Sequence, residues 1–129
     1  MLIVRCGTLT NMFNFEKLDV WQRSIELADA IYKNTRAFPA HERFGLTNQM
    51  RRAVVSLSSN IAEGSSRRSK TDFGRFVEIA TGSAFELVSQ AFVAKRQGFL
   101  TEAEFQAIYA ESEQIGRMLS GLKNSLIKN

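Results

Sequence analysis

The chain has 129 residues, of which 44% are hydrophobic and 23% are charged. These values are typical of one soluble folded domain, and they exclude a chain that is disordered throughout. The formal net charge of +4 permits an anionic partner without requiring one. Because Cys6 is the only cysteine, an internal disulfide is excluded, and we expect a cytoplasmic protein.

The first residues stand apart from the rest of the sequence. Residues 1–12 precede the first helical pattern, and we expect a poorly ordered leader before a single domain at residues 13–129. The opening segment is too short and too polar for a signal peptide. No stretch of about 18 apolar residues is present, so we expect no membrane span and no membrane partner.

Apolar residues that recur every three or four positions predict four amphipathic helices and no strand. The first helical region covers residues 15–38 and ends before Pro39. The second helix begins near Glu42 or Phe44 and ends at Gly64. The predicted core positions of these two helices are Leu18, Trp21, Ile25, Ala28, Ile31, Thr35, Leu46, Met50, Ala53, Val54, Leu57 and Ile61.

The two later helices carry clear end signals. Ser69 is predicted to cap the third helix, with Asp72 in its first turn, and Gly98 is predicted to end it. Thr101 and Glu104 predict a capping box at the start of the fourth helix. The predicted core positions are Phe73, Phe76, Ala80, Ala84, Leu87, Ala91, Ala94, Phe105, Ile108, Ser112, Ile115, Leu119, Leu122 and Leu126. Because the connections are short, we predict an all-α, antiparallel up-down-up-down four-helix bundle.

The second helix, with RRAVVSLSSNIAEG at residues 51–64, has more small and polar positions than one buried face requires. On a helical wheel they form two faces beside the core stripe. One face, the polar ladder, consists of Gln49, Arg52, Ser56, Asn60 and Glu63, and the small-residue face consists of Val55, Ser58 and Ala62. Either this surface is solvated, or the helix packs on more than one side, within the bundle or against another subunit. On the second interpretation Arg52, Asn60 and Glu63 are removed from solvent and hydrogen-bonded.

The third helix has a second apolar line, formed by Phe85, Val88 and Phe92. One interpretation is a wide core stripe. The other is an exposed apolar patch, and such patches usually mark interfaces. We favour self-association through this line and the small-residue face.

Three segments together resemble a known family. They are LDVWQRSIELADAIYKNT, ERFGLTNQMRRAVVSLSSNIAEGSSRRS and DFGRFVEIATGSAFEL. They resemble the 23S rRNA-intervening sequence protein family, also called the four-helix bundle protein family, and the resemblance extends from about Phe15 to Leu126. Its most specific part runs from Gln49 to Gly64 and is followed by the pair Gly82 and Ser83.

The resemblance implies a four-helix bundle that assembles as a ring-like homopentamer. It also implies similarity to the accessory variability proteins of diversity-generating retroelements, which are basic, bind nucleic acid and contact a reverse transcriptase. No established catalytic activity comes with the family, so we expect a protein that is not an enzyme.

Catalytic and metal chemistry find little support in the sequence. A di-iron site in a helical bundle needs Glu-x-x-His motifs, and the single histidine, His41, is not part of one. His41 also has no evident nucleophile to activate. The glycines are scattered rather than gathered in a phosphate-binding loop. We therefore expect no catalytic residues, no metal and no cofactor.

Basic residues give the remaining functional signal. One cluster, at the corner joining the second and third helices, consists of Arg67, Arg68, Lys70 and Arg75. At the opposite end, antiparallel packing gathers Lys33, Arg36, Arg43, Arg51, Arg52, Lys95 and Arg96. Either cluster suits phosphate groups of RNA or DNA. Two functions stay open, which are nucleic-acid binding and an oligomeric scaffold that binds another protein.

Overall fold

The computed structural model describes residues 13–127, and the expectation for residues 1–12 lies outside them. No strand occurs in this part of the chain, which confirms the all-α prediction. Four helices are joined by short connections, and two short 3₁₀ helices accompany them. The helices are α1 (Asp19–Thr35), α2 (Leu46–Ser65), α3 (Lys70–Arg96) and α4 (Glu102–Ile127), and the 3₁₀ helices are η3 (Asn14–Lys17) and η4 (Ala40–Glu42).

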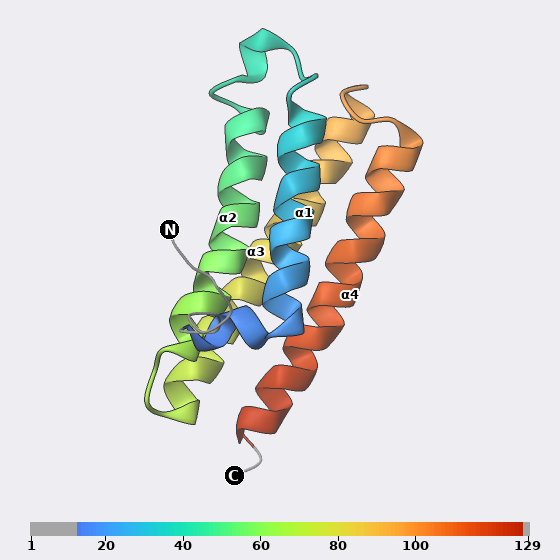
Figure 1. Cartoon of the computed structure of the whole chain (residues 1–129). Coiled ribbons are helices and arrows are strands. Elements are labelled where there is room, and N and C mark those ends of the chain that lie inside the picture. Colours follow the sequence, from blue (N-terminus) through green and yellow to red (C-terminus); the bar gives the residue numbers. More distant parts are fainter. Residues whose placement is uncertain (1–12, 128–129) are drawn as a thin grey trace, which may run out of the picture.

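The four helices lie side by side (Figure 1). The α1–α2 and α3–α4 connections lie at one end of the molecule, the α1–α2 end, and the α2–α3 connection lies at the other, the α2–α3 end (Figure 1). Helix α2 packs on α1 and α3, and α4 packs on α3 and α1. Each helix therefore has two helical neighbours, and the four inner faces enclose one hydrophobic core.

The predicted signals at the ends of α3 and α4 are confirmed. The Ser69 hydroxyl accepts a hydrogen bond from the Asp72 backbone N–H at 3.0 Å. Gly98 follows α3 with a φ of +81°, in the left-handed region that favours glycine. Thr101 and Glu104 bond each other's backbone N–H at 3.0 and 2.9 Å, which completes the capping box.

The predicted start of α2 is a few residues too early. Residues Ala40–Glu42 form the turn η4 directly after Pro39, and the helix begins only at Leu46. The backbone of Gly45, with φ −107° and ψ −115°, separates the two elements. The Glu42 carboxylate then accepts the Leu46 N–H at 3.0 Å, so a residue expected inside the helix stabilises its beginning instead.

The core confirms most of the positions predicted for α2, α3 and α4. The wholly buried side chains include Met50, Leu57 and Ile61 of α2 and Leu87 of α3. Helix α4 buries its predicted positions from Phe105 to Leu119, whereas those nearer its C-terminus are partly buried. In α3 the phenylalanines of the first turns are only partly buried, and Val77, which was not predicted, joins the core.

The core face of α1 is rotated relative to the prediction. The buried residues are Val20, Ser24, Leu27, Ile31 and Thr35, of which only the last two were predicted. Ile25, predicted to be in the core, is exposed. The reason is Ser24, whose hydroxyl donates to the Trp21 carbonyl at 2.6 Å and so tolerates burial.

Helices α2 and α3 approach each other closely. A Cβ atom placed on Gly64 would lie 2.7 Å from the Phe76 Cβ and 3.0 Å from the Phe73 ring, so the missing side chain is what allows both residues to approach. Further along, the hydroxyls of Ser56 and Ser83 are 2.9 Å apart and form a hydrogen bond between the helices. This close packing therefore explains part of the excess of small and polar residues at positions 51–64 of α2.

An ion pair connects α1 to α4. The Arg23 Nε and Nη2 atoms donate to the two carboxylate oxygens of Glu111 at 2.8 and 2.9 Å. This two-point bond fixes the orientation of both side chains. The hydrogen bond from Arg23 lowers the pKa of Glu111 below its ordinary value, and the same bond raises the pKa of Arg23.

The α2–α3 contact predicts that Gly64→Ala destabilises the fold by about 1–3 kcal/mol, because the added methyl overpacks against Phe76. Gly82→Ala is the matched control, since nothing lies within 4 Å of its Cβ position. That change is expected to stabilise α3 by up to about 1 kcal/mol through helix propensity. Urea denaturation of both variants measures the difference, and equal shifts of the two would refute the close contact.

The Arg23–Glu111 pair predicts a pH-dependent contribution to stability. Since the folded pKa of Glu111 is depressed, its contribution is present above the unfolded pKa and disappears as pH falls through the folded pKa. Glu111→Gln should therefore lower the thermal midpoint at neutral pH and have no effect at strongly acid pH. Glu113→Gln, which removes a pair within α4, is the control. A midpoint difference for Glu111→Gln that is the same at all pH values would contradict the assignment.

Candidate functional site

The polar ladder of α2 has two kinds of members. Asn60 donates to the backbone and side-chain oxygens of Ser56 at 2.8 and 3.1 Å, and Ser56 bonds to Ser83 of α3. These residues hold α2 on α3. Their partner Ser83 was not predicted to take part, although it belongs to the Gly82–Ser83 pair that stands out in the sequence.

The other members, Gln49, Arg52 and Glu63, are exposed in the single chain. Glu63 accepts a hydrogen bond from Arg67 one turn further along at 2.8 Å, and Arg52 lies at the surface. Within the single chain Arg52 and Glu63 therefore stay in solvent, and their removal from solvent by another subunit stays a prediction. Helix α2 has helical neighbours on two sides only, and neither of them covers the Arg52 or Glu63 side chain.

The small-residue face is only partly available to a partner. Val55 is exposed, but Ser58 is buried, and its hydroxyl donates a hydrogen bond to the Val55 carbonyl at 3.1 Å. Ala62 is half-buried at the end where η3 packs on α2. Ser58 thus lies mostly in the interior of the single chain, and its role as an interface residue stays a prediction.

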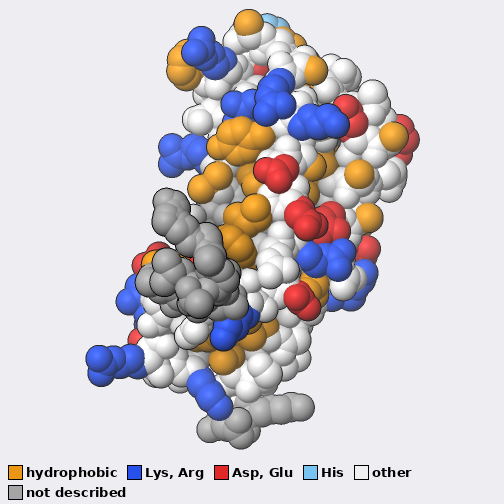
Figure 2. Space-filling view, viewed as in Figure 1, with side chains coloured by type: hydrophobic (Ala, Val, Ile, Leu, Met, Phe, Trp, Pro, Cys, Tyr) orange, Lys and Arg blue, Asp and Glu red, His pale blue; other side chains and the backbone are white. Residues whose placement is uncertain are grey.

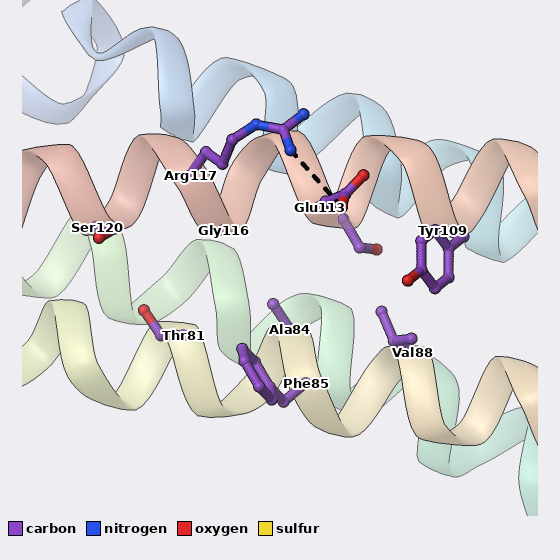
Figure 3. Close-up of a pocket in the computed structure, with 10 residues that line it drawn as sticks. Thr81, Ala84, Phe85, Val88, Tyr109, Glu113, Gly116, Arg117 and Ser120 are labelled. Carbon is purple, nitrogen blue, oxygen red and sulfur yellow. Dashed lines mark ion pairs between the residues drawn. The ribbon is translucent and has the colours of Figure 1, made fainter.

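An apolar groove lies between α3 and α4, with a volume of about 560 Å³. Figure 3 shows side chains from the two helices facing each other across it, with Phe85 on α3 and Tyr109 on α4. Phe85 is 72% exposed, whereas Val88 is half-buried. The lining residues are Thr81, Ala84, Phe85, Val88, Tyr109, Ser112, Glu113, Gly116, Arg117 and Ser120.

One lining residue and one residue outside the lining bear on the role of this groove. The buried Ser112 hydroxyl has no hydrogen-bond partner among the described residues. Phe92, the third member of the predicted apolar line, packs edge-on against Phe105 with ring centroids 4.7 Å apart. Phe92 therefore supports the fold as well as the surface, and Phe85 is the most exposed part of the line.

At the α2–α3 end, half of the predicted basic cluster is paired with acids. Arg67 bonds to Glu63 and lies over the Phe76 ring at 4.7 Å, and Arg75 lies 3.8 Å from Asp72. Arg68 and Lys70 are exposed and form no ion pair with any described residue. The structure brings the four residues together, but much of their charge is locally balanced.

The opposite end has more unbalanced positive charge. Lys95 pairs with Glu102 at 2.8 Å, and its hydrogen bond lowers the pKa of that carboxylate. The remaining cations of this end form no ion pair within residues 13–127, and they are Lys33, Arg36, Arg43, Arg51, Arg52 and Arg96. Figure 2 shows Lys and Arg side chains gathered at this end, whereas Asp and Glu side chains lie mainly toward α4.

A depression of about 550 Å³ interrupts this basic surface between α1 and α2. It is lined by Tyr32, Asn48, Arg51, Arg52, Val55 and Ser56. Sequence reasoning identified the arginines but missed Tyr32 and Asn48. Asn48 could have been found, because it lies three and four positions before Arg51 and Arg52 and so shares their helix face.

No group of three His, Cys, Asp or Glu residues between positions 13 and 127 is placed to hold a metal ion. None of the helices in that range is long and apolar enough to cross a membrane.

Comparisons with known proteins identify the family. No curated protein sequence matches this chain. A crystal structure from Bacteroides thetaiotaomicron, of a protein with unknown function from the S23 ribosomal protein family, is similar to it with a TM-score of 0.72 and 26% identity, covering 85% of this chain and 99% of that one. The sequence profile of the 23S rRNA-intervening sequence protein family matches residues 16–121. This chain therefore belongs to the 23S rRNA-intervening sequence protein family.

Proposed function

We propose that this protein is a non-enzymatic, cytoplasmic oligomer that binds the phosphate backbone of RNA or DNA through the α1–α2 end of its bundle. The observation that carries the proposal is the set of cations at this end without acidic partners among the described residues. Cations that are not engaged in ion pairs keep their charge available for the phosphates of a polyanion. Backbone contacts carry no sequence information, so the binding has little sequence preference.

The proposed assembly is a ring-like homopentamer of antiparallel bundles, as the resemblance implies. Its support in this chain is the exposed Phe85 beside an apolar groove, because apolar surface of this kind usually marks an interface. A ring places several copies of the basic end together and raises avidity for one nucleic acid. The proposal extends to a role like that of the accessory variability proteins of diversity-generating retroelements.

A protein-binding scaffold is the second candidate function. The α3–α4 groove favours it, because its lining is mainly apolar and contains an unpartnered buried hydroxyl. A scaffold of this kind binds no nucleic acid. Measuring the binding of RNA and DNA to the protein therefore distinguishes the two functions.

Reversal of charge at each end tests the proposed nucleic-acid surface. The double variant Arg43→Glu, Arg52→Glu should weaken binding to every RNA and DNA sequence and reduce the slope of log affinity against log salt. The matched double variant Arg68→Glu, Lys70→Glu changes exposed, unpaired cations at the other end and should have the smaller effect. Fluorescence anisotropy at two salt concentrations measures both. Salt-independent binding, or none, would favour the scaffold.

Light scattering tests the assembly. The protein should have a mass about five times the 14.5 kDa of one chain, and Phe85→Asp should dissociate it, because a charge cannot be buried unpaired in an interface. Phe44→Asp is the control, since Phe44 is a similarly exposed phenylalanine in the α1–α2 connection. A parent protein that is monomeric at micromolar concentration would refute the assembly.

A further inference from the structure

The depression between α1 and α2 contains a stacked pair, the Tyr32–Arg51 surface, in which the Arg51 guanidinium covers one face of the Tyr32 ring. The Arg51 guanidinium carbon lies 4.6 Å from the centre of the Tyr32 ring. Its Nε donates to the Thr35 hydroxyl at 2.9 Å, and its Nη2 donates to the Tyr32 carbonyl at 3.4 Å. Thr35 is itself buried and bonded to the Ile31 carbonyl at 2.7 Å. The guanidinium is thus held in place, with N–H groups remaining for a ligand.

Helix α2 adds complementary groups around this surface. Asn48, Arg51, Arg52 and Val55 follow one another at helical spacings and all line the depression. Both charged groups of the lining are cations, and no carboxylate is part of it. An anionic ligand therefore meets two guanidinium groups and an amide, while Val55 and the Tyr32 ring provide apolar contact.

This combination fits a nucleotide better than a simple anion. Bases stack on aromatic rings and on Arg guanidinium planes, and phosphates bind Arg side chains. A volume of about 550 Å³ is within the usual range for small-molecule sites. We infer that this depression holds one unpaired nucleotide of a single-stranded RNA or DNA segment, with the base on the Tyr32–Arg51 surface and the phosphate at Arg52 and Asn48. The inference rests on the proposed function and specifies its ligand.

The neighbouring residues favour a strand over a free nucleotide. Lys33 follows Tyr32 on α1, Arg36 lies directly after the helix, and Arg43 lies in the connection to α2. All three are exposed, so the positive surface continues beyond the depression. Proteins that bind single strands combine such a basic path with stacking side chains. A duplex keeps its bases stacked inside, so it reaches the cations but not the Tyr32 ring.

Tyrosine variants test the stacking. Tyr32→Leu should weaken binding of a labelled oligouridylate or oligothymidylate of about ten nucleotides roughly tenfold, because one stacked base is lost. Binding to a duplex of equal length should not change. Tyr32→Phe keeps the ring and should bind like the parent. Phe13→Leu is the control, since Phe13 is an exposed aromatic residue near the far end of α2. Thermal melting of each variant checks that the fold persists.

Fluorine NMR gives a direct readout, because the chain has only two tyrosines and fluorotyrosine labels both. The single strand should shift the Tyr32 signal and leave that of Tyr109 in place. Uridine monophosphate should compete only at far higher concentration, and competition at equal concentration would overturn the strand as the occupant. If the parent and Tyr32→Leu bind every nucleic acid equally, or lose duplex and strand equally, the inference fails while the proposed function stands. Absence of any salt-dependent binding removes both.

Discussion

The close packing of α2 on α3 is the constraint on which the other surfaces depend. Gly64 leaves room for Phe76, and the Ser56–Ser83 hydrogen bond connects the two helices further along. With this side of α2 committed to α3, the arginines at positions 51 and 52 lie on its surface toward α1 and solvent. Residues 51–64 are rich in small and polar groups because one helix supports both a tight contact and a charged surface.

The sequence predicted α2 and α4 well because their buried residues are apolar and follow one helical spacing. It predicted α1 poorly, since a serine occupies a central buried position while Ile25 remains outside. A hydroxyl that bonds to a carbonyl of its own helix is satisfied wherever it lies. Polarity alone therefore could not place Ser24, and the centre of the core face of α1 was predicted to lie to one side of its true position, although Ile31 and Thr35 were placed correctly.

The sequence identified which cationic residues belong to the candidate site, but it did not show which of them form ion pairs. Both clusters of cations were identified, but which of them meet an acid depends on neighbours across a turn or a connection, as with Lys95 and Glu102. Tyr32 carried no signal, because a tyrosine on an amphipathic helix is ordinary. Its position became informative only when α1 and α2 placed it beneath Arg51.

The connection between α3 and α4 has a consequence for the order in which the chain folds. Gly98, the Lys95–Glu102 pair and the Thr101–Glu104 capping box all lie within a few residues of one another, so the turn is specified locally. Closing so short a loop costs little chain entropy. Contacts that are near in sequence form rapidly. The α3–α4 hairpin is thus suited to form early in folding.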